Sequence, residues 1–94
     1  MGELRDFVAA ASEKLGIPPE TLAGLPVVEL TGDMAVMIEQ HQGICAYSEG
    51  EVCVRVSSGM LRITGSGLTI RLMNHRRMIL LGKIMAVLLE RQEK

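Results

Sequence analysis

The chain has 94 residues, a formal net charge of −1 and 48% hydrophobic residues, but only two aromatic side chains, Phe7 and Tyr47, and two cysteines. This length predicts one domain, and the balanced charge with so few aromatics argues against a nucleic-acid-binding protein, because such proteins need a basic surplus and stacking side chains. The cysteines are too few for a disulfide framework, and neither a signal peptide nor a membrane span is visible, so we expect a cytoplasmic protein.

Residues 3–15 have the spacing of an amphipathic helix. Apolar side chains recur every three or four residues and form one stripe: Leu4, Phe7, Val8, Ala11 and Leu15. Gly16 and the Pro18-Pro19 pair end the pattern. We therefore divide the chain into a helical segment, 1–24, and a β domain, 25–94, and expect the helix to cover part of the sheet.

From Val27 onward the apolar residues alternate, and short runs are separated by pairs typical of two-residue turns. These pairs are Gln42-Gly43, Glu49-Gly50, Ser58-Gly59 and Gly65-Ser66. The resulting register pairs Ile38 with Tyr47, Tyr47 with Val52, Cys45 with Val54, Val54 with Ile63, Val56 with Leu61, and Ile63 with Leu68. The predicted fold is mainly β, an N-terminal helix followed by an antiparallel β-meander of six or seven short strands, rolled, closed into a small barrel or stacked.

This register gathers apolar side chains on one face of the sheet, because residues two apart share a face. The predicted core consists of Val36, Ile38, Cys45, Tyr47, Val52, Val54, Val56, Leu61, Ile63, Leu68, Ile70 and Leu72. The end of the chain fits two structures. Residues 76–94 read as two strands turning at Gly82-Lys83, or as a helix with Leu81, Met85, Leu88 and Gln92 on one face.

The stretch Gly65-Ser66-Gly67 invites comparison with phosphate-binding loops. The dinucleotide fingerprint needs a further glycine at position 70, which is Ile70, and a following helix, whereas the residues after Gly67 alternate like a strand. No Gly-Lys-Ser/Thr sequence is present. A hairpin turn is the favoured interpretation, and no cofactor is expected.

The histidines and cysteines do not form a known metal-binding or nucleophile pattern. His41, Cys45, Cys53 and His75 are spaced unlike zinc ligands, and the predicted register turns Cys45 to the core and Cys53 to the other face. Glu39 and His41 share the outer face and could form an acid–base pair, but a solvated strand face is the favoured interpretation. We expect no metal and no enzymatic activity.

The outer face of the predicted sheet carries several arginines. The register places Arg55 opposite Arg62 with Arg71 diagonal to them, and Met60 and Met73 lie on the same face. Such a face either solubilises the sheet or docks a partner. We take Arg55, Arg62, Arg71, Met60 and Met73 as the candidate docking residues.

Several stretches between residues 25 and 90 resemble the YabP/YqfC family of bacterial sporulation proteins, and its YqfC branch most closely. The carriers are the Leu25-Pro26 dipeptide, Gly32, IEQHQGI, AYSEGEVCV, SSGMLRITGSGLTI and LLGKI. Family turn glycines match Gly43, Gly59, Gly65, Gly67 and Gly82, and Gly50 lies in a further predicted turn. Cys45 and Cys53 depart from the family pattern, which has an aliphatic and a polar residue there.

The resemblance implies a non-enzymatic protein required for endospore formation in Firmicutes. It also implies a membrane-associated sporulation protein as the partner, and it favours strands for MILLGKI. The exposed sheet edges add the expectation of a homo-oligomer. The alternative function is a small module that binds a phospholipid or another anionic ligand through the Arg55, Arg62 and Arg71 face.

Overall fold

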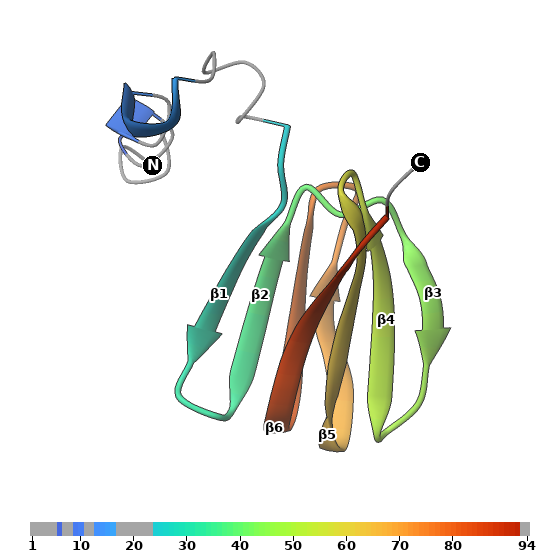
Figure 1. Cartoon of the computed structure of the whole chain (residues 1–94). Helices are drawn as coiled ribbons and strands as arrows, with labels where there is room; N and C mark the ends of the chain where they lie inside the picture. The colour runs from blue at the N-terminus through green and yellow to red at the C-terminus, as the bar shows by residue number, and fades with distance from the viewer. Residues whose placement is uncertain (1–5, 7–8, 11–12, 17–23, 93–94) are drawn as a thin grey trace.

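The structure is a computed structural model, and it describes residues 6, 9–10, 13–16 and 24–92. The described part of the sheet domain is mainly β, with six antiparallel strands in one open sheet. The strands are β1 (Val27–Thr31), β2 (Ala35–Glu39), β3 (Ile44–Tyr47), β4 (Glu51–Val56), β5 (Gly59–Met73) and β6 (Arg77–Arg91). Their order across the sheet is β1-β2-β6-β5-β4-β3 (Figure 1).

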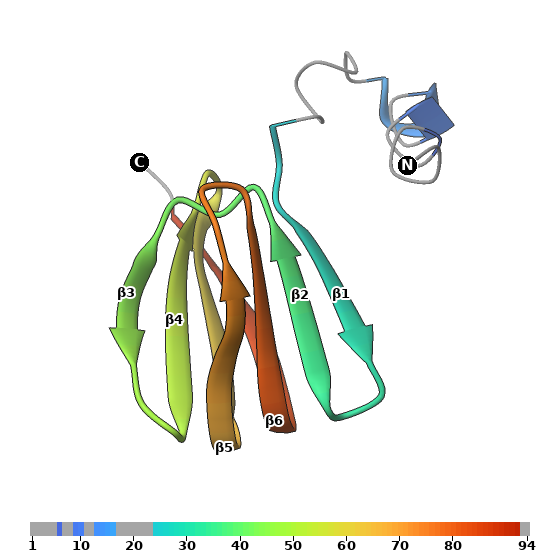
Figure 2. The same ribbon diagram turned by 180° about the vertical axis from the view of Figure 1, so that it is seen from behind.

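The two long strands, β5 and β6, run through both halves of the molecule and fold the sheet over on itself. The first half of β5 pairs with β4, whereas the first half of β6 pairs with β2. One layer, the β4 layer, contains β3, β4, residues 59–65 and residues 84–91. The β2 layer contains β1, β2, residues 69–73 and residues 77–81. Figures 1 and 2 show the end of β6 crossing the face of the β2 layer.

The core lies between these two layers. Eight residues of the predicted core face are buried: Val36, Ile38, Val52, Val54, Val56, Leu61, Ile63 and Leu68. Met78 and Leu80 complete it from β6, and Ile70 packs against it. The alternation therefore predicted most of the buried face correctly. Cys45, Tyr47 and Leu72 were predicted to be buried but are exposed. Cys45 and Tyr47 belong to the edge strand β3, and the register shift between Ile70 and Leu72 turns Leu72 to the outer face opposite Ile79.

The predicted hairpin turn at Gly65-Ser66 is wrong, because these residues lie within β5 where the sheet bends. The register of β5 against β6 shifts between Thr64 and Gly65 and again between Ser66 and Thr69. A Cβ built on Gly65 would lie 1.9 Å from the carbonyl oxygen of Lys83. The glycine lets two backbones approach at the corner, a role distinct from chain reversal.

The other predicted turns have mixed outcomes. The β3–β4 hairpin turns at the predicted position with Tyr47 opposite Val52, but the predicted Cys45–Val54 pair is wrong, because the bulge between Ile44 and Ala46 places Ile44 opposite Val54. The β4–β5 turn is Ser57-Ser58, so Val54 faces Leu61 rather than Ile63, and Val56 faces Gly59. Each β4 residue gains a partner two positions away from the predicted one, which preserves the faces and hence the core.

Gln42-Gly43 does not close a hairpin. Ile38 pairs with Val28 and Met78, not with Tyr47. The reason is that the chain crosses from β2 to β3, which lies at the opposite edge of the sheet. The C-terminal strands are confirmed, but as one strand without the predicted turn at Gly82-Lys83, and the helix alternative is wrong. β2 requires a partner on its second side, and the first half of β6 fills that position.

The N-terminal segment is described only in part. Residues 6, 9–10 and 13–15 are helical, and Gly16 adopts a φ of +69° in a turn, as its predicted stop position requires. The other residues of the predicted helix lie outside the described residues, so the full helix stays a prediction. All described residues of this segment are exposed, and Leu15 is 62% exposed, so none of them covers the sheet.

Candidate functional site

The structure disperses the predicted docking residues over both layers. Arg55 lies opposite Met60, and Arg62 lies opposite Cys53, so the predicted Arg55–Arg62 opposition is wrong. Arg71 and Met73 belong to the second half of β5, in the β2 layer. The change follows from the one-residue shift of the β4–β5 turn and from the bend in β5.

Arg62 is held in an ion-pair network on the outer face of the β4 layer. Its guanidinium binds Glu51 and also donates to Glu90, with Nη2 3.2 Å and Nε 3.3 Å from the two carboxylate oxygens. The hydrogen bonds to Glu90 and Glu51 raise the pKa of Arg62, and the bond from Arg62 lowers the pKa of Glu51. Arg62 therefore links three strands and is occupied within its own chain.

The two cysteines are placed opposite to the predicted burial. Cys53 lies on the outer face, as predicted from alternation, but it is only 5% exposed and its thiol donates to Glu51 over 3.6 Å. Burial raises the pKa of the Cys53 thiol. Cys45 is exposed at a bulge in the edge strand β3. Among the described residues no group of three His, Cys, Asp or Glu side chains could hold a metal ion.

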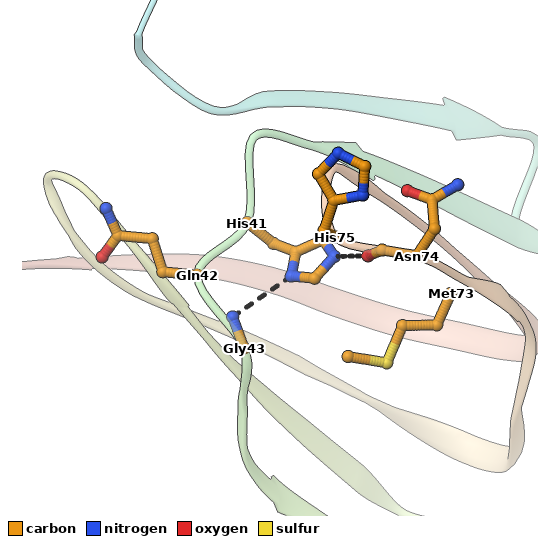
Figure 3. A pocket seen from close by; sticks show the side chains of 6 residues that line it. All are labelled: His41, Gln42, Gly43, Met73, Asn74 and His75. Atoms are coloured by element: carbon orange, nitrogen blue, oxygen red, sulfur yellow. Dashed lines mark hydrogen bonds between the residues drawn. The ribbon is translucent and has the colours of Figure 1, made fainter.

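His41 is buried in the crossover from β2 to β3, where alternation predicted a solvated strand face. Its Nδ1 accepts a hydrogen bond from the Gly43 amide at 3.1 Å, so Nε2 carries the proton and donates to the carbonyl of Asn74 at 2.7 Å (Figure 3). Glu39 instead binds Arg77, with the closer oxygen 2.6 Å from Nη2. The predicted Glu39–His41 pair is therefore not formed.

A shallow depression surrounds this histidine at the end of the β5–β6 hairpin. Figure 3 shows its lining residues: His41, Gln42, Gly43, Met73, Asn74 and His75. Both ring nitrogens of His41 are used by backbone groups, so the ring serves as a bridge between two loops. The sequence signal was the short His-Gln-Gly spacing, which places an amide two residues from the ring.

The outer face of the β2 layer carries an apolar surface that the sequence analysis missed. Met37 on β2, Ile79 on β6 and Leu72 on β5 lie opposite one another across three strands. Leu81 and Ala35 form the neighbouring row. Leu72 is 42% and Leu81 39% exposed, since no described element covers them. We call these five residues the apolar face.

Within the described residues, no helix has the length and apolar character required to cross a membrane. Comparison with known proteins finds the YabP family over residues 25–94. The chain is also 30% identical, over 85 residues, to the uncharacterized protein YqfC of Bacillus subtilis (strain 168), and this match covers 89% of the chain and 91% of the relative. No solved structure matches it significantly. The chain therefore belongs to the YabP family, in agreement with the resemblance carried by its strand and turn residues.

Proposed function

We propose that this chain is a non-enzymatic adaptor in endospore formation that works through protein–protein contact in the cytoplasm of the sporulating cell. The partner is a membrane-associated sporulation protein, the kind of partner that the family resemblance implies. The observation that carries the proposal is the apolar face, because apolar side chains adjoining across three strands are typical of protein-contact surfaces.

This surface supports the proposal better than the arginine face does. Arg62, the centre of the predicted patch, already binds Glu51 and Glu90, and charges satisfied within the chain offer little to a partner. Leu72 and Leu81, by contrast, expose a substantial part of their side chains. Covering them with another protein removes apolar surface from water, which favours association.

The test is complementation of a deletion strain. Deleting the gene is expected to block sporulation and leave vegetative growth normal, and the wild-type gene should restore spores. A variant with Leu72→Asp and Leu81→Asp should fail to restore them, because two carboxylates on the apolar face resist burial against a partner. Leu88→Asp is the matched control, since Leu88 is 48% exposed on the outer face of the other layer.

The purified variants should unfold at a temperature close to that of the wild-type chain, which separates a lost contact from a lost fold. A double variant that is folded and restores normal spore numbers contradicts the proposed surface. A deletion strain that sporulates normally contradicts the proposed function. Sedimentation of the same preparations measures the homo-oligomer that the sequence analysis predicts.

A further inference from the structure

The cations of the sheet domain are distributed unevenly along the chain. Between Glu51 and Glu90 there is no aspartate or glutamate, and the six cations of this stretch are Arg55, Arg62, Arg71, Arg76, Arg77 and Lys83. Arg62 and Arg77 are neutralised by the ion pairs described above. Among the described residues, the remaining four form no ion pair.

The strand directions bring three of these four cations to one end of the sandwich. Arg55 is the penultimate residue of β4, Arg71 lies near the end of β5, and Arg76 lies in the β5–β6 turn. The crossover loop, residues 40–43, lies between two of them: Gln42 donates to the carbonyl of Arg55 and Gln40 to that of Arg76, each at 2.7 Å. Arg91 ends β6 at the same end (Figure 1).

We call Arg55, Arg71, Arg76 and Arg91 the basic end. The two carboxylates of the sheet that reach it, Glu39 and Glu90, are each bound to an arginine. The opposite end holds the β1–β2 and β3–β4 turns, which carry Asp33 and Glu49 (Figures 1 and 2). Lys83 is the one cation at this end without an ion pair among the described residues, and Glu51 at the start of β4 is bound to Arg62. The two ends of the sheet domain therefore differ in charge, one basic and one acidic, although the net charge of the whole chain is only −1.

The basic end has no preformed cradle for one small anion. The amides of the loops are used internally: Gly43 donates to His41, and Arg76 and Arg77 donate to the Asn74 side chain. Both nitrogens of His41 are also occupied. Several separate guanidinium groups around loops whose Gly43, Arg76 and Arg77 amides are already bonded match an extended sheet of negative charge, rather than a single bound phosphate.

An exposed apolar side chain lies among these cations. Met73, at the end of β5, is 47% exposed and lines the shallow depression beside the crossover loop (Figure 3). A flexible apolar side chain next to arginines suits the boundary between lipid headgroups and acyl chains, where basic groups meet phosphates and apolar groups enter the interface. An acidic polypeptide would satisfy the arginines but leaves Met73 without a comparable environment.

We propose that the basic end binds the headgroups of an anionic lipid membrane, so that the strands stand on the membrane surface with the Asp33–Glu49 end turned away. The orientation follows from the charge asymmetry, because a negative surface attracts the basic end and repels the acidic one. This binding is a peripheral contact. It needs no partner protein and so does not depend on the adaptor contact proposed above.

Vesicle flotation with the purified full-length chain tests this proposal. The chain should float with vesicles that mix phosphatidylglycerol into phosphatidylcholine and remain unbound with pure phosphatidylcholine, and raising the salt concentration should release it. Arg76→Gln should lower the partition coefficient about fivefold, and Arg55→Gln with Arg76→Gln about 25-fold, if each cation contributes the usual amount near an anionic surface.

Lys83→Gln is the matched control, because it removes the same charge at the bend, at the opposite end of the strands. It should leave vesicle binding within about twofold of the wild type, since a charge turned away from the membrane lies beyond the Debye length. Met73→Gln keeps the charge and should still weaken binding severalfold. Thermal unfolding of each variant checks that these exposed substitutions leave the fold intact.

Several results would overturn the proposal. They are absence of binding to anionic vesicles at low salt, equal binding to neutral vesicles, and an equal loss with Lys83→Gln and Arg76→Gln. Release of the chain from the vesicles by inorganic phosphate at constant ionic strength would identify a single-anion site instead. Binding to polyglutamate in the absence of vesicle binding would identify an acidic polypeptide as the ligand. Because the vesicles contain no protein, none of these results bears on the proposed contact between the apolar face and a partner protein.

Discussion

Gly82 of β6 lies directly against the backbone of Gly67 of β5, so closely that a Cβ at position 82 would be 2.7 Å from the Gly67 carbonyl oxygen. A φ of +144° at Gly82 also disfavours other residues. Gly65 and Lys83 make the equivalent approach in the other direction. The two long strands therefore meet backbone to backbone where the sheet bends, and no side chain fits at Gly65 or Gly82.

The corner predicts a strong effect of a single methyl group. Gly65→Ala would place its Cβ 1.9 Å from the Lys83 carbonyl oxygen, and because that neighbour is backbone, the strands must separate. We expect the free energy of unfolding to fall by about 3 kcal/mol, at the upper end of the range for overpacking. Urea unfolding followed by circular dichroism measures this loss.

Gly50→Ala is the control for the corner. Its Cβ would make an ordinary contact of 3.7 Å with the Gly65 carbonyl oxygen, and Gly50 has no positive φ. Its stability should remain within about 0.5 kcal/mol of the wild type, the usual range for exposed positions. Equal stability of the Gly65→Ala and Gly50→Ala variants would show that the bend does not require close backbone approach.

The bridge made by His41 predicts that the two histidines of the depression differ in their contribution to stability. His41→Ala removes both the acceptor for the Gly43 amide and the donor for the Asn74 carbonyl, and should lower the free energy of unfolding by about 2 kcal/mol. His75→Ala, at the exposed histidine of the same depression, should change it by less than about 0.5 kcal/mol. Urea unfolding compares the two variants.

The same geometry fixes the tautomer of His41. Nitrogen-15 NMR of the imidazole should show a protonated Nε2 and an unprotonated Nδ1, because Nδ1 accepts the Gly43 amide proton. A proton on Nδ1 of the neutral ring would contradict the bridge. His75 provides the exposed reference signal in the same spectrum.

The ion pair of Glu51 predicts a pH dependence of stability. The pKa of Glu51 is lowered from 4.5, chiefly by the hydrogen bond from Arg62, so the folded state binds its proton less readily than the unfolded state. This contribution is fully present above pH 4.5 and decreases as the pH falls towards the lowered value. Glu51→Gln should therefore reduce the loss of thermal stability between neutral and acidic pH.

Glu49→Gln is the control for the Glu51→Gln variant, since Glu49 is exposed in the turn that precedes Glu51 and forms no ion pair among the residues described. Thermal unfolding at a series of pH values should show a shallower acid slope for Glu51→Gln than for Glu49→Gln. Parallel slopes for both variants would contradict a stabilising role of the Glu51–Arg62 pair.

The two thiols should differ sharply in reactivity. Cys45 is exposed at the β3 bulge, whereas Cys53 is buried and its pKa is raised by that burial. Because the thiolate is the reactive form, a disulfide reagent at neutral pH should modify Cys45 quickly and Cys53 only after unfolding in urea. Cys45→Ser should abolish the fast reaction, while a fast reaction that persists in this variant would place Cys53 at the surface.

The sequence by itself determined the mainly β class, the family and most of the buried face. Alternation at Val52, Val54 and Leu61 depends only on the period of a strand, and it survives a turn that moves by one position. The Gly50 turn was equally local, because its short loop joins strands that pair with each other. Such features need no knowledge of the rest of the chain.

Only the tertiary structure decided what the glycines at 65, 67 and 82 do and where the charges meet. A glycine between alternating residues is compatible with a turn or with a bend, and the choice depends on which distant backbone lies against it. In this protein the backbone of β6 lies against these glycines, and β5 continues through the bend. Arg71 therefore lies in the other layer from Arg55 and Arg62, while arginines from separate strands gather at one end. These pairings join residues far apart in the chain, so the local sequence pattern does not predict them.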